Sequence, residues 1–104
     1  MQLIQILIIG TNKPIMETIA RLIDRDGIWQ ATIAFSIDDA FDVCLLKDFK
    51  IVLIGAGIDE DEELKLKAHL VKSKPNLPIV KHYGGGSGLL FAEIHQALNS
   101  NTKH

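Results

Sequence analysis

The sequence predicts an α/β fold in which helices cover both faces of an open parallel sheet of four strands. Two observations lead to this prediction. Short runs of branched apolar residues alternate with longer segments that have the apolar period of an amphipathic helix. The alternation is strict, with four strand–helix repeats along the chain. Successive strands joined by helices are expected to run parallel, with right-handed crossovers.

The composition supports one ordinary globular domain. A chain of 104 residues can build one core but not two. Its apolar fraction of 47% and charged fraction of 23% argue against disorder. The net charge of −2 and the scattered lysines give no support for nucleic-acid binding.

The location of the protein is predicted from its single cysteine and its first residues. Cys44 has no partner for an internal disulfide, which is typical of the cytoplasm. The apolar first ten residues are too short a run for a membrane span, are interrupted by Gln5 and lack a basic flank. We therefore expect a cytoplasmic domain over residues 1–104, with a frayed tail at 99–104 and no membrane contact.

The first repeat is expected to be a strand over residues 3–9, ended by Gly10, and then a helix. Thr11 or Asn12 would cap this helix, and Pro14 suits its first turn, where a missing N–H costs nothing. The predicted apolar stripe consists of Ile15, Ile19, Leu22 and Ile23. Asp26 and Gly27 would end the helix.

The second repeat begins with a less apolar strand at 29–34, as expected near a sheet edge. Ser36, followed three residues later by Asp39, resembles a capping box and opens the next helix. The predicted apolar stripe of this helix consists of Ile37, Phe41, Cys44 and Leu45. Cys44 on that stripe is interpreted as a small buried hydrophobe.

The third and fourth repeats complete the sheet. Residues 51–54 are apolar on both faces, which indicates a central strand. The acids at 59–63 and the later lysines match the dipole of a helix, and an acidic metal site is the remote alternative. A fourth strand is expected at 79–83, a glycine-rich loop at 84–88, and a final helix with an apolar stripe made by Leu90, Ile94, Ala97 and Leu98.

The carboxyl ends of the strands are where open α/β sheets bind ligands. Here those ends are Gly10-Thr11-Asn12, Phe35-Ser36, Gly55-Ala56-Gly57 and Tyr83-Gly84-Gly85-Gly86. They contain no carboxylate pair, no Cys–His pair and no spacing of metal ligands. The sequence therefore predicts no catalytic residue, no metal and no cofactor.

Three segments, ILIIGTNKPIMETIARLI, GIWQATIAFSIDDAFDVCLLKDFKIVLIG and LPIVKHYG, resemble response-regulator receiver domains of the CheY-like fold. The resemblance covers about residues 3–84 and the final helix. It implies a flavodoxin-like sheet with strand order 2-1-3-4.

The resemblance also implies where a phosphorylation site would lie. A receiver takes a phosphoryl group on an aspartate after its third strand, and an acidic pair after the first strand holds Mg²⁺. In this chain the acidic pair falls at Gly10 and Thr11, the phosphoacceptor at Gly55, and the hydroxyl residue of the fourth strand at Tyr83. Too few residues lie between Gly84 and Leu89 for another helix and a fifth strand, so that strand's lysine is missing too.

These departures predict a non-catalytic pseudo-receiver of a two-component-type signalling system, which acts by protein contact without aspartate phosphorylation. The alternative is a small-molecule or anion-binding domain for phosphate or a nucleotide. Its candidate loop consists of Gly84, Gly85, Gly86, Ser87 and Gly88, which precede a helix amino terminus. A glycine-rich loop that only joins two elements is the simpler interpretation of the same residues.

The protein partner is not identified by the sequence. Without a fifth strand, the fourth strand becomes an edge, with Lys81 and His82 in it. Charge on an edge protects it from pairing, and the rival interpretation is that this edge pairs with a partner. A homodimer would then form through the fourth-strand edge or through the last helix.

Overall fold

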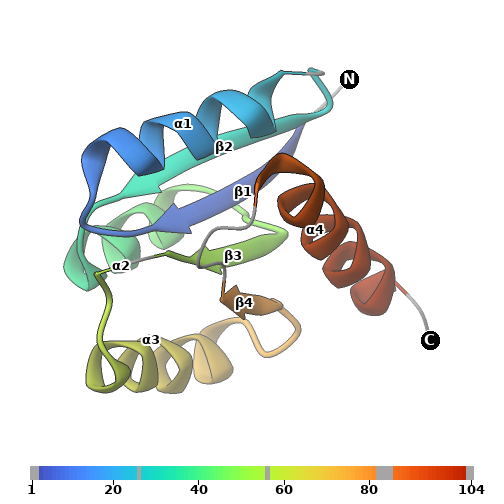
Figure 1. Cartoon of the computed structure of the whole chain (residues 1–104). Helices are drawn as coiled ribbons and strands as arrows, with labels where there is room; N and C mark the ends of the chain where they lie inside the picture. The colour runs from blue at the N-terminus through green and yellow to red at the C-terminus, as the bar shows by residue number, and fades with distance from the viewer. Residues whose placement is uncertain (1–2, 26, 56, 82–85, 103–104) are drawn as a thin grey trace.

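The computed structural model describes residues 3–25, 27–55, 57–81 and 86–102, in which four strands alternate with four helices (Figure 1). The elements are β1 (Ile4–Ile9), α1 (Lys13–Asp24), β2 (Trp29–Ala34), α2 (Ile37–Leu46), β3 (Ile51–Ile54), α3 (Glu60–Ser73), β4 (Ile79–Lys81) and α4 (Gly86–Thr102). The strands form one parallel sheet in the order β2-β1-β3-β4. The predicted fold class and strand order are confirmed.

The register of the sheet brings the ends of its two central strands together. Strand β1 pairs with β2 from Ile4 opposite Trp29 onward, and with β3 as far as Ile9 opposite Ile54. Strand β3 is buried at every position, as its apolar sequence predicts for a central strand. Strand β2 lies at one edge, and among the described strands β4 lies at the other.

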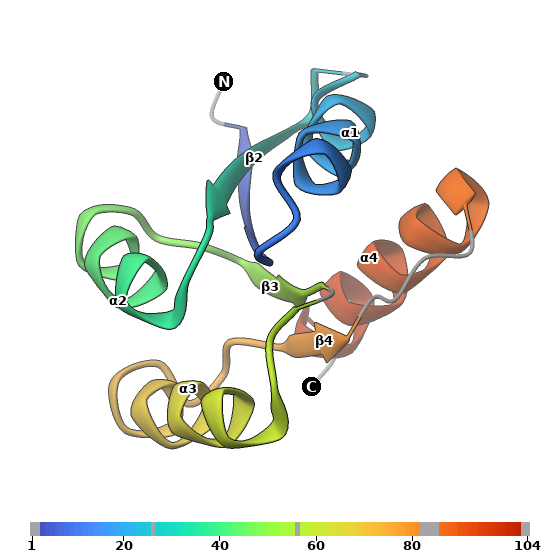
Figure 2. The same cartoon turned by 60° about the vertical axis from the view of Figure 1, so that its left-hand side comes forward.

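Helices α2 and α3 cover one face of the sheet, and α1 and α4 cover the other (Figure 2). Because side chains alternate along a strand, β1 and β3 supply residues to a separate core on each side. Leu7, Ile9, Val52 and Ile54 pack with residues of α2 and α3. Ile6, Ile8, Ile51 and Leu53 pack with residues of α1 and α4.

Three helices begin at side-chain caps. The Asn12 carboxamide oxygen accepts from the backbone N–H of Ile15 at 3.1 Å, so Asn12 rather than Thr11 caps α1. The Ser36 hydroxyl caps α2 by accepting from the N–H of Asp39 at 3.1 Å. Helix α3 has a full capping box between Asp59 and Glu62.

The predicted apolar stripes of α1 and α2 are each wrong at one position. In α1, Met16 and Ile23 are fully buried, and Ile15 is 46% exposed. In α2, Ala40 is buried beside Ile37 and Cys44, and Leu45 is 82% exposed. Neighbouring residues differ by about 100° around a helix, so of Ile15 and Met16 in α1 only Met16 lies at the centre of the buried face. Packing against the sheet determines which apolar residues of each helix are buried.

Helix α4 begins within the predicted glycine-rich loop. Gly86, Ser87 and Gly88 form its first turn, so the loop prediction is wrong for these three residues. Their backbone continues the helix whose buried face carries Leu90, Ile94 and Ala97. Gly84 and Gly85 lie outside the described residues, as do His82 and Tyr83 of the predicted fourth strand. The helix extends to Thr102, and within the described ranges no helix is long and apolar enough to cross a membrane.

Candidate functional site

The candidate site is the place where β1 and β3 end side by side. Ile9 pairs with Ile54, so Gly10 and Gly55 follow at adjacent positions. The Gly55 N–H donates to the Ile9 carbonyl at 2.7 Å, and the Gly10 N–H donates to the Ala34 carbonyl at 3.0 Å. Both glycines are buried. The structure thus brings together two of the residues predicted for the degenerate pocket.

The side chain of Met16 occupies the space next to Gly55. A Cβ atom at position 55 would lie 2.7 Å from Met16 Cε, 3.4 Å from Met16 Sδ and 3.3 Å from the Ile9 carbonyl oxygen. The remaining cavity, lined also by Ile8, Ile19 and Leu53, measures about 10 Å³. Such a volume is at the lower limit for one water molecule, and its walls are apolar.

Thr11 closes the same end of the sheet from the side. Its side chain lies directly over the backbone of Gly57, where a Cβ would overlap Thr11 Oγ1. Gly57 has a φ of +94°, a conformation that only glycine adopts without strain. Thr11 is therefore a covering side chain above the β3–α3 turn, at a position where the resemblance would place a metal-binding acid.

The residues at this end of the sheet provide few groups that could bind a phosphoryl group or a metal ion. Gly10, Thr11 and Gly55 supply no carboxylate. The Asp59 carboxylate after β3 accepts the Glu62 N–H at 2.8 Å as the cap of α3. In the part of the chain that the structure describes, no group of three His, Cys, Asp or Glu residues could hold a metal ion. Tyr83, the fourth predicted pocket residue, lies outside that part.

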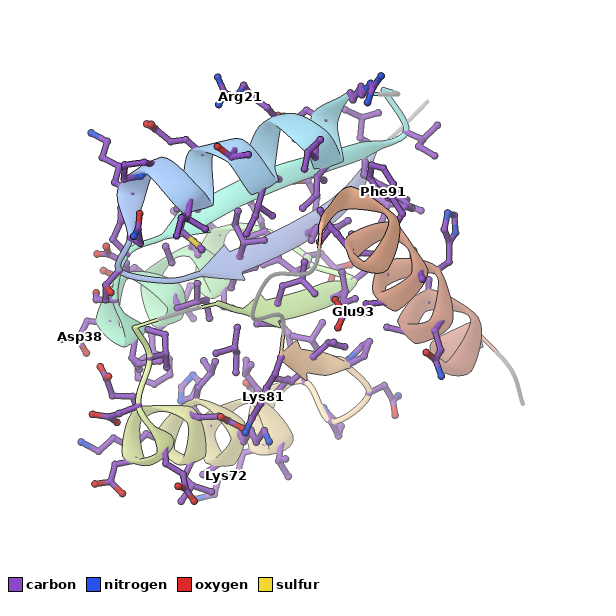
Figure 3. The ribbon with its side chains drawn as sticks, in the orientation of Figure 1. Arg21, Asp38, Lys72, Lys81, Phe91 and Glu93 are labelled. Atoms are coloured by element: carbon purple, nitrogen blue, oxygen red, sulfur yellow. The ribbon has the colours of Figure 1, made fainter. Side chains whose placement is uncertain are left out.

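An ion cluster around one buried carboxylate lies beside β4, and Figure 3 labels Lys81, its member in that strand. Glu63 of α3 is only 5% exposed. Its carboxylate accepts from Lys67 Nζ at 2.8 Å and from Lys81 Nζ at 3.0 Å. The hydrogen bonds from Lys67 and Lys81 hold the pKa of Glu63 below its ordinary value, although burial acts in the opposite direction.

The sequence interpretation missed this cluster because Glu63 stands in a run of acids. One signal was present: Glu63 has the helical phase of Leu66 and Leu70, at i, i+3 and i+7, and all three are buried. Lys81 was predicted to protect the sheet edge. Its ammonium group contacts Glu63 of α3, so this lysine also ties the edge strand to that helix.

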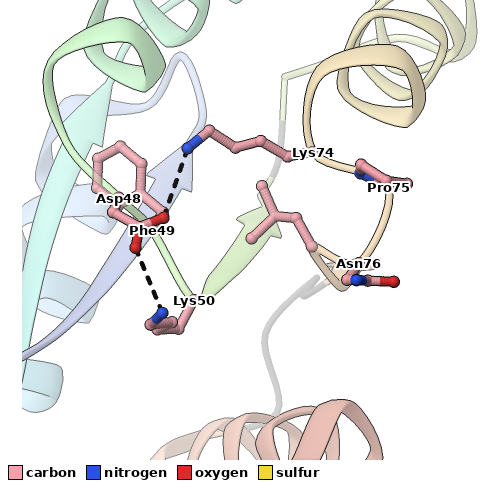
Figure 4. A pocket seen from close by; sticks show the side chains of 7 residues that line it. Asp48, Phe49, Lys50, Lys74, Pro75 and Asn76 are labelled. Atoms are coloured by element: carbon pink, nitrogen blue, oxygen red, sulfur yellow. Dashed lines mark hydrogen bonds and ion pairs between the residues drawn. The ribbon is translucent and has the colours of Figure 1, made fainter.

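A second hollow lies at the opposite, amino end of the sheet (Figure 4). It measures about 190 Å³ between the start of β3 and the turn before β4. The Asp48 carboxylate accepts from Lys50 at 3.3 Å and from Lys74 at 3.5 Å, and the hydrogen bond from Lys50 lowers the pKa of Asp48. These largely exposed charges compensate one another and link the loop before β3 to the loop before β4. They lie at the amino end of the sheet, whereas open sheets bind ligands at the carboxyl end.

Cys44 and two histidines pack against neighbouring residues of the fold. Cys44 is buried, as predicted, and burial raises the pKa of its thiol. The His69 ring lies 4.5 Å from that of Phe41, between α3 and α2, and the His95 ring lies 5.0 Å from that of Trp29. These rings contribute to packing between elements.

Strand order and helix layers define the class: the chain has the fold of CheY-like response-regulator receiver domains. No protein-family model matches the sequence, and no curated protein does either.

Three solved structures show the likeness. A CheY-like receiver domain protein from Methanospirillum hungatei superposes with a TM-score of 0.85 at 14% identity, covering 98% of both chains. A sensor protein from Polaromonas has a TM-score of 0.82 at 13% identity, over 95% of this chain and 98% of that one. The response regulator TrrA from Thermotoga maritima, solved with Mg²⁺ and BeF, has a TM-score of 0.79 at 12% identity, over 92% of this chain and 100% of that one. Identities this low establish the fold alone.

Proposed function

We propose that the protein is a non-catalytic pseudo-receiver that works in two-component-type signalling in the cytoplasm, through contact with another protein and without phosphorylation of an aspartate. The observation that carries the proposal is the Met16 side chain packed against Gly55. The receiver fold supports the signalling setting, and the residues at the strand ends support the loss of the phosphorylation switch.

The chemistry of phosphoryl transfer explains why this packing matters. A phosphoacceptor carboxylate needs room for a phosphoryl group and a divalent cation to offset its charge. Here the Met16 thioether lies in the space beside Gly55, and the small cavity that remains is lined by apolar residues such as Ile8. A charged phosphoryl group placed there without partners would be strongly destabilised. The surface of the protein, rather than this pocket, would then carry its interactions.

The test is incubation of the chain with acetyl phosphate and Mg²⁺, followed by intact mass measurement. We expect no increase by one phosphoryl group, while a phosphorylatable receiver treated in parallel gains one. Hydroxylamine treatment identifies any acyl phosphate that forms. A labelled aspartate anywhere in the chain would overturn the proposal.

Anion binding is the second candidate function. It is supported by the amino terminus of α4 at Gly86, because Gly86, Ser87 and Gly88 give the first turn a glycine-rich backbone. Titration with inorganic phosphate and with ATP, followed by thermal unfolding, tests it. A ligand that binds the folded state raises the midpoint by mass action, and an unchanged midpoint removes this candidate.

A further inference from the structure

Helix α3 has two apolar stripes, and one of them packs against the sheet. Leu66 and Leu70 are buried in the core. On another side of the helix, Leu64 is 59% exposed and Val71 is 64% exposed, with the exposed Ala68 between them. Their spacing of i, i+4 and i+7 aligns the three on one face. The helix lies at the margin of the molecule in both cartoon views (Figures 1 and 2), which leaves its outer side open.

This face differs from the other exposed apolar residues. Leu45 and Leu46 at the end of α2 are more exposed, at 82% and 81%. They are consecutive, however, so they point about 100° apart and form no stripe. A contiguous apolar stripe on a helix is the pattern that packs against a second helix.

Charge along the same flank of α3 indicates which helix would fit. Asp61 lies at the acidic amino end, and Lys65 and Lys72 follow toward the carboxyl end. All three are exposed beside the apolar stripe. An identical helix turned end for end places the acid of each copy near Lys72 of the other. A uniformly acidic or basic partner would match only one end of this face.

We propose that the outer face of α3, made by Leu64, Ala68 and Val71 with Asp61 and Lys72 at its flank, binds the same face of a second copy of the chain. The two helices pack antiparallel about a twofold axis near Ala68. Leu64 of each copy contacts Val71 of the other, and Asp61 of each copy pairs with Lys72 of the other.

The symmetry of the sequence positions favours this arrangement. In a twofold interface, residue i contacts j and residue j contacts i. The midpoint of Leu64 and Val71 along the helix lies close to Lys67 and Ala68. The midpoint of Asp61 and Lys72 lies close to the same residues, so one twofold axis can relate both pairs. The small Ala68 side chain lets the two helices approach at the crossing. No residue of this face is among those that surround Gly55, so this dimer does not depend on the proposed loss of phosphorylation.

The first test is solution mass by light scattering and sedimentation from about 1 µM to about 1 mM, a range that covers moderate association. The dimer fraction of the native chain should rise with concentration. Leu64→Glu should remain monomeric throughout. The matched control is Leu45→Glu, which makes the same change at an exposed leucine of α2 and should dimerise as the native chain does. Circular dichroism checks that both variants are folded.

A charge exchange and a cross-link test the geometry. Asp61→Lys and Lys72→Asp should each weaken the dimer severalfold, and the double variant should recover much of the affinity. Ala68→Cys should form a covalent dimer under mild oxidation, whereas Ala92→Cys, at an exposed position of α4, should not. A native chain that stays monomeric over the whole range overturns the proposal, and so does a dimer that Leu64→Glu leaves intact.

Discussion

The methyl carbon of Met16 lies 2.7 Å from the point where any side chain at position 55 would begin. Met16 belongs to the first turns of α1 and Gly55 follows directly after β3, so this contact joins α1 to the place where the resemblance to receivers would put the phosphoacceptor. Directly after the four branched apolar residues of β3, a residue without a side chain leaves room for the end of this methionine.

Gly55→Ala should therefore destabilise the fold by about 1 kcal/mol through overpacking, at the low end of such effects because the end of the Met16 side chain can shift. Met16→Ala should cost about 2–5 kcal/mol because it leaves a cavity. In the double variant the new methyl group takes part of the vacated space, so the loss should be smaller than the sum. Urea denaturation of the four proteins measures this coupling. Additive losses would show that the two residues are not in contact.

Gly57 and Gly27 form a matched pair for separating backbone strain from steric overlap. Both have positive φ, at +94° and +72°, but only a Cβ at Gly57 would meet Thr11, whereas one at Gly27 would meet nothing within 4 Å. Gly27→Ala should cost about 1–2 kcal/mol from strain alone. Gly57→Ala should cost more.

Adding Thr11→Ala should recover part of the loss in Gly57→Ala and none of the loss in Gly27→Ala. Thermal and urea unfolding give the comparison. Equal losses at the two glycines would mean that Thr11 does not press on Gly57.

The sequence was sufficient for the sheet and for the positions of the glycines at its carboxyl end. Runs of branched residues such as Ile51–Ile54 have few alternatives to a buried strand. The filling of the pocket was not predictable in the same way. Ile15 and Met16 are both apolar, and local periodicity allows either one to face the sheet. The rotation of α1 depends on its packing against β2 and β1 and on the approach of Met16 to Gly55, which a local pattern does not contain.

The cap of α3 can be tested without touching either core. Asp59→Ala removes the acceptor of the Glu62 N–H bond and should lower the free energy of unfolding by about 0.5–2 kcal/mol. Asp59→Asn should retain most of the stability because asparagine caps helices about as well. Chemical denaturation compares the three proteins. An asparagine variant as unstable as the alanine variant would show that the charge, rather than the cap, is what stabilises the helix.

The ion cluster around Glu63 predicts a pH dependence of stability. The pKa of Glu63 is lowered in the folded protein by hydrogen bonds from Lys67 and Lys81, relative to an ordinary value of 4.5. A lowered pKa means that the unfolded chain binds the proton more tightly. The stabilisation is therefore complete above about pH 4.5 and is lost as the pH falls through the folded-state pKa.

Glu63→Gln should lower the free energy of unfolding by about 1 kcal/mol near neutral pH, a modest value because both lysines are about half exposed. The difference from the native chain should shrink as the pH is lowered from about 7 to about 3, because protonation removes the same charge from the native side chain. Glu17→Gln, at an exposed position of α1, is the control for a general change in net charge. Urea unfolding at a series of pH values measures both differences. A gap for Glu63→Gln that stays constant over this range would mean that the carboxylate charge does not stabilise the junction of α3 and β4.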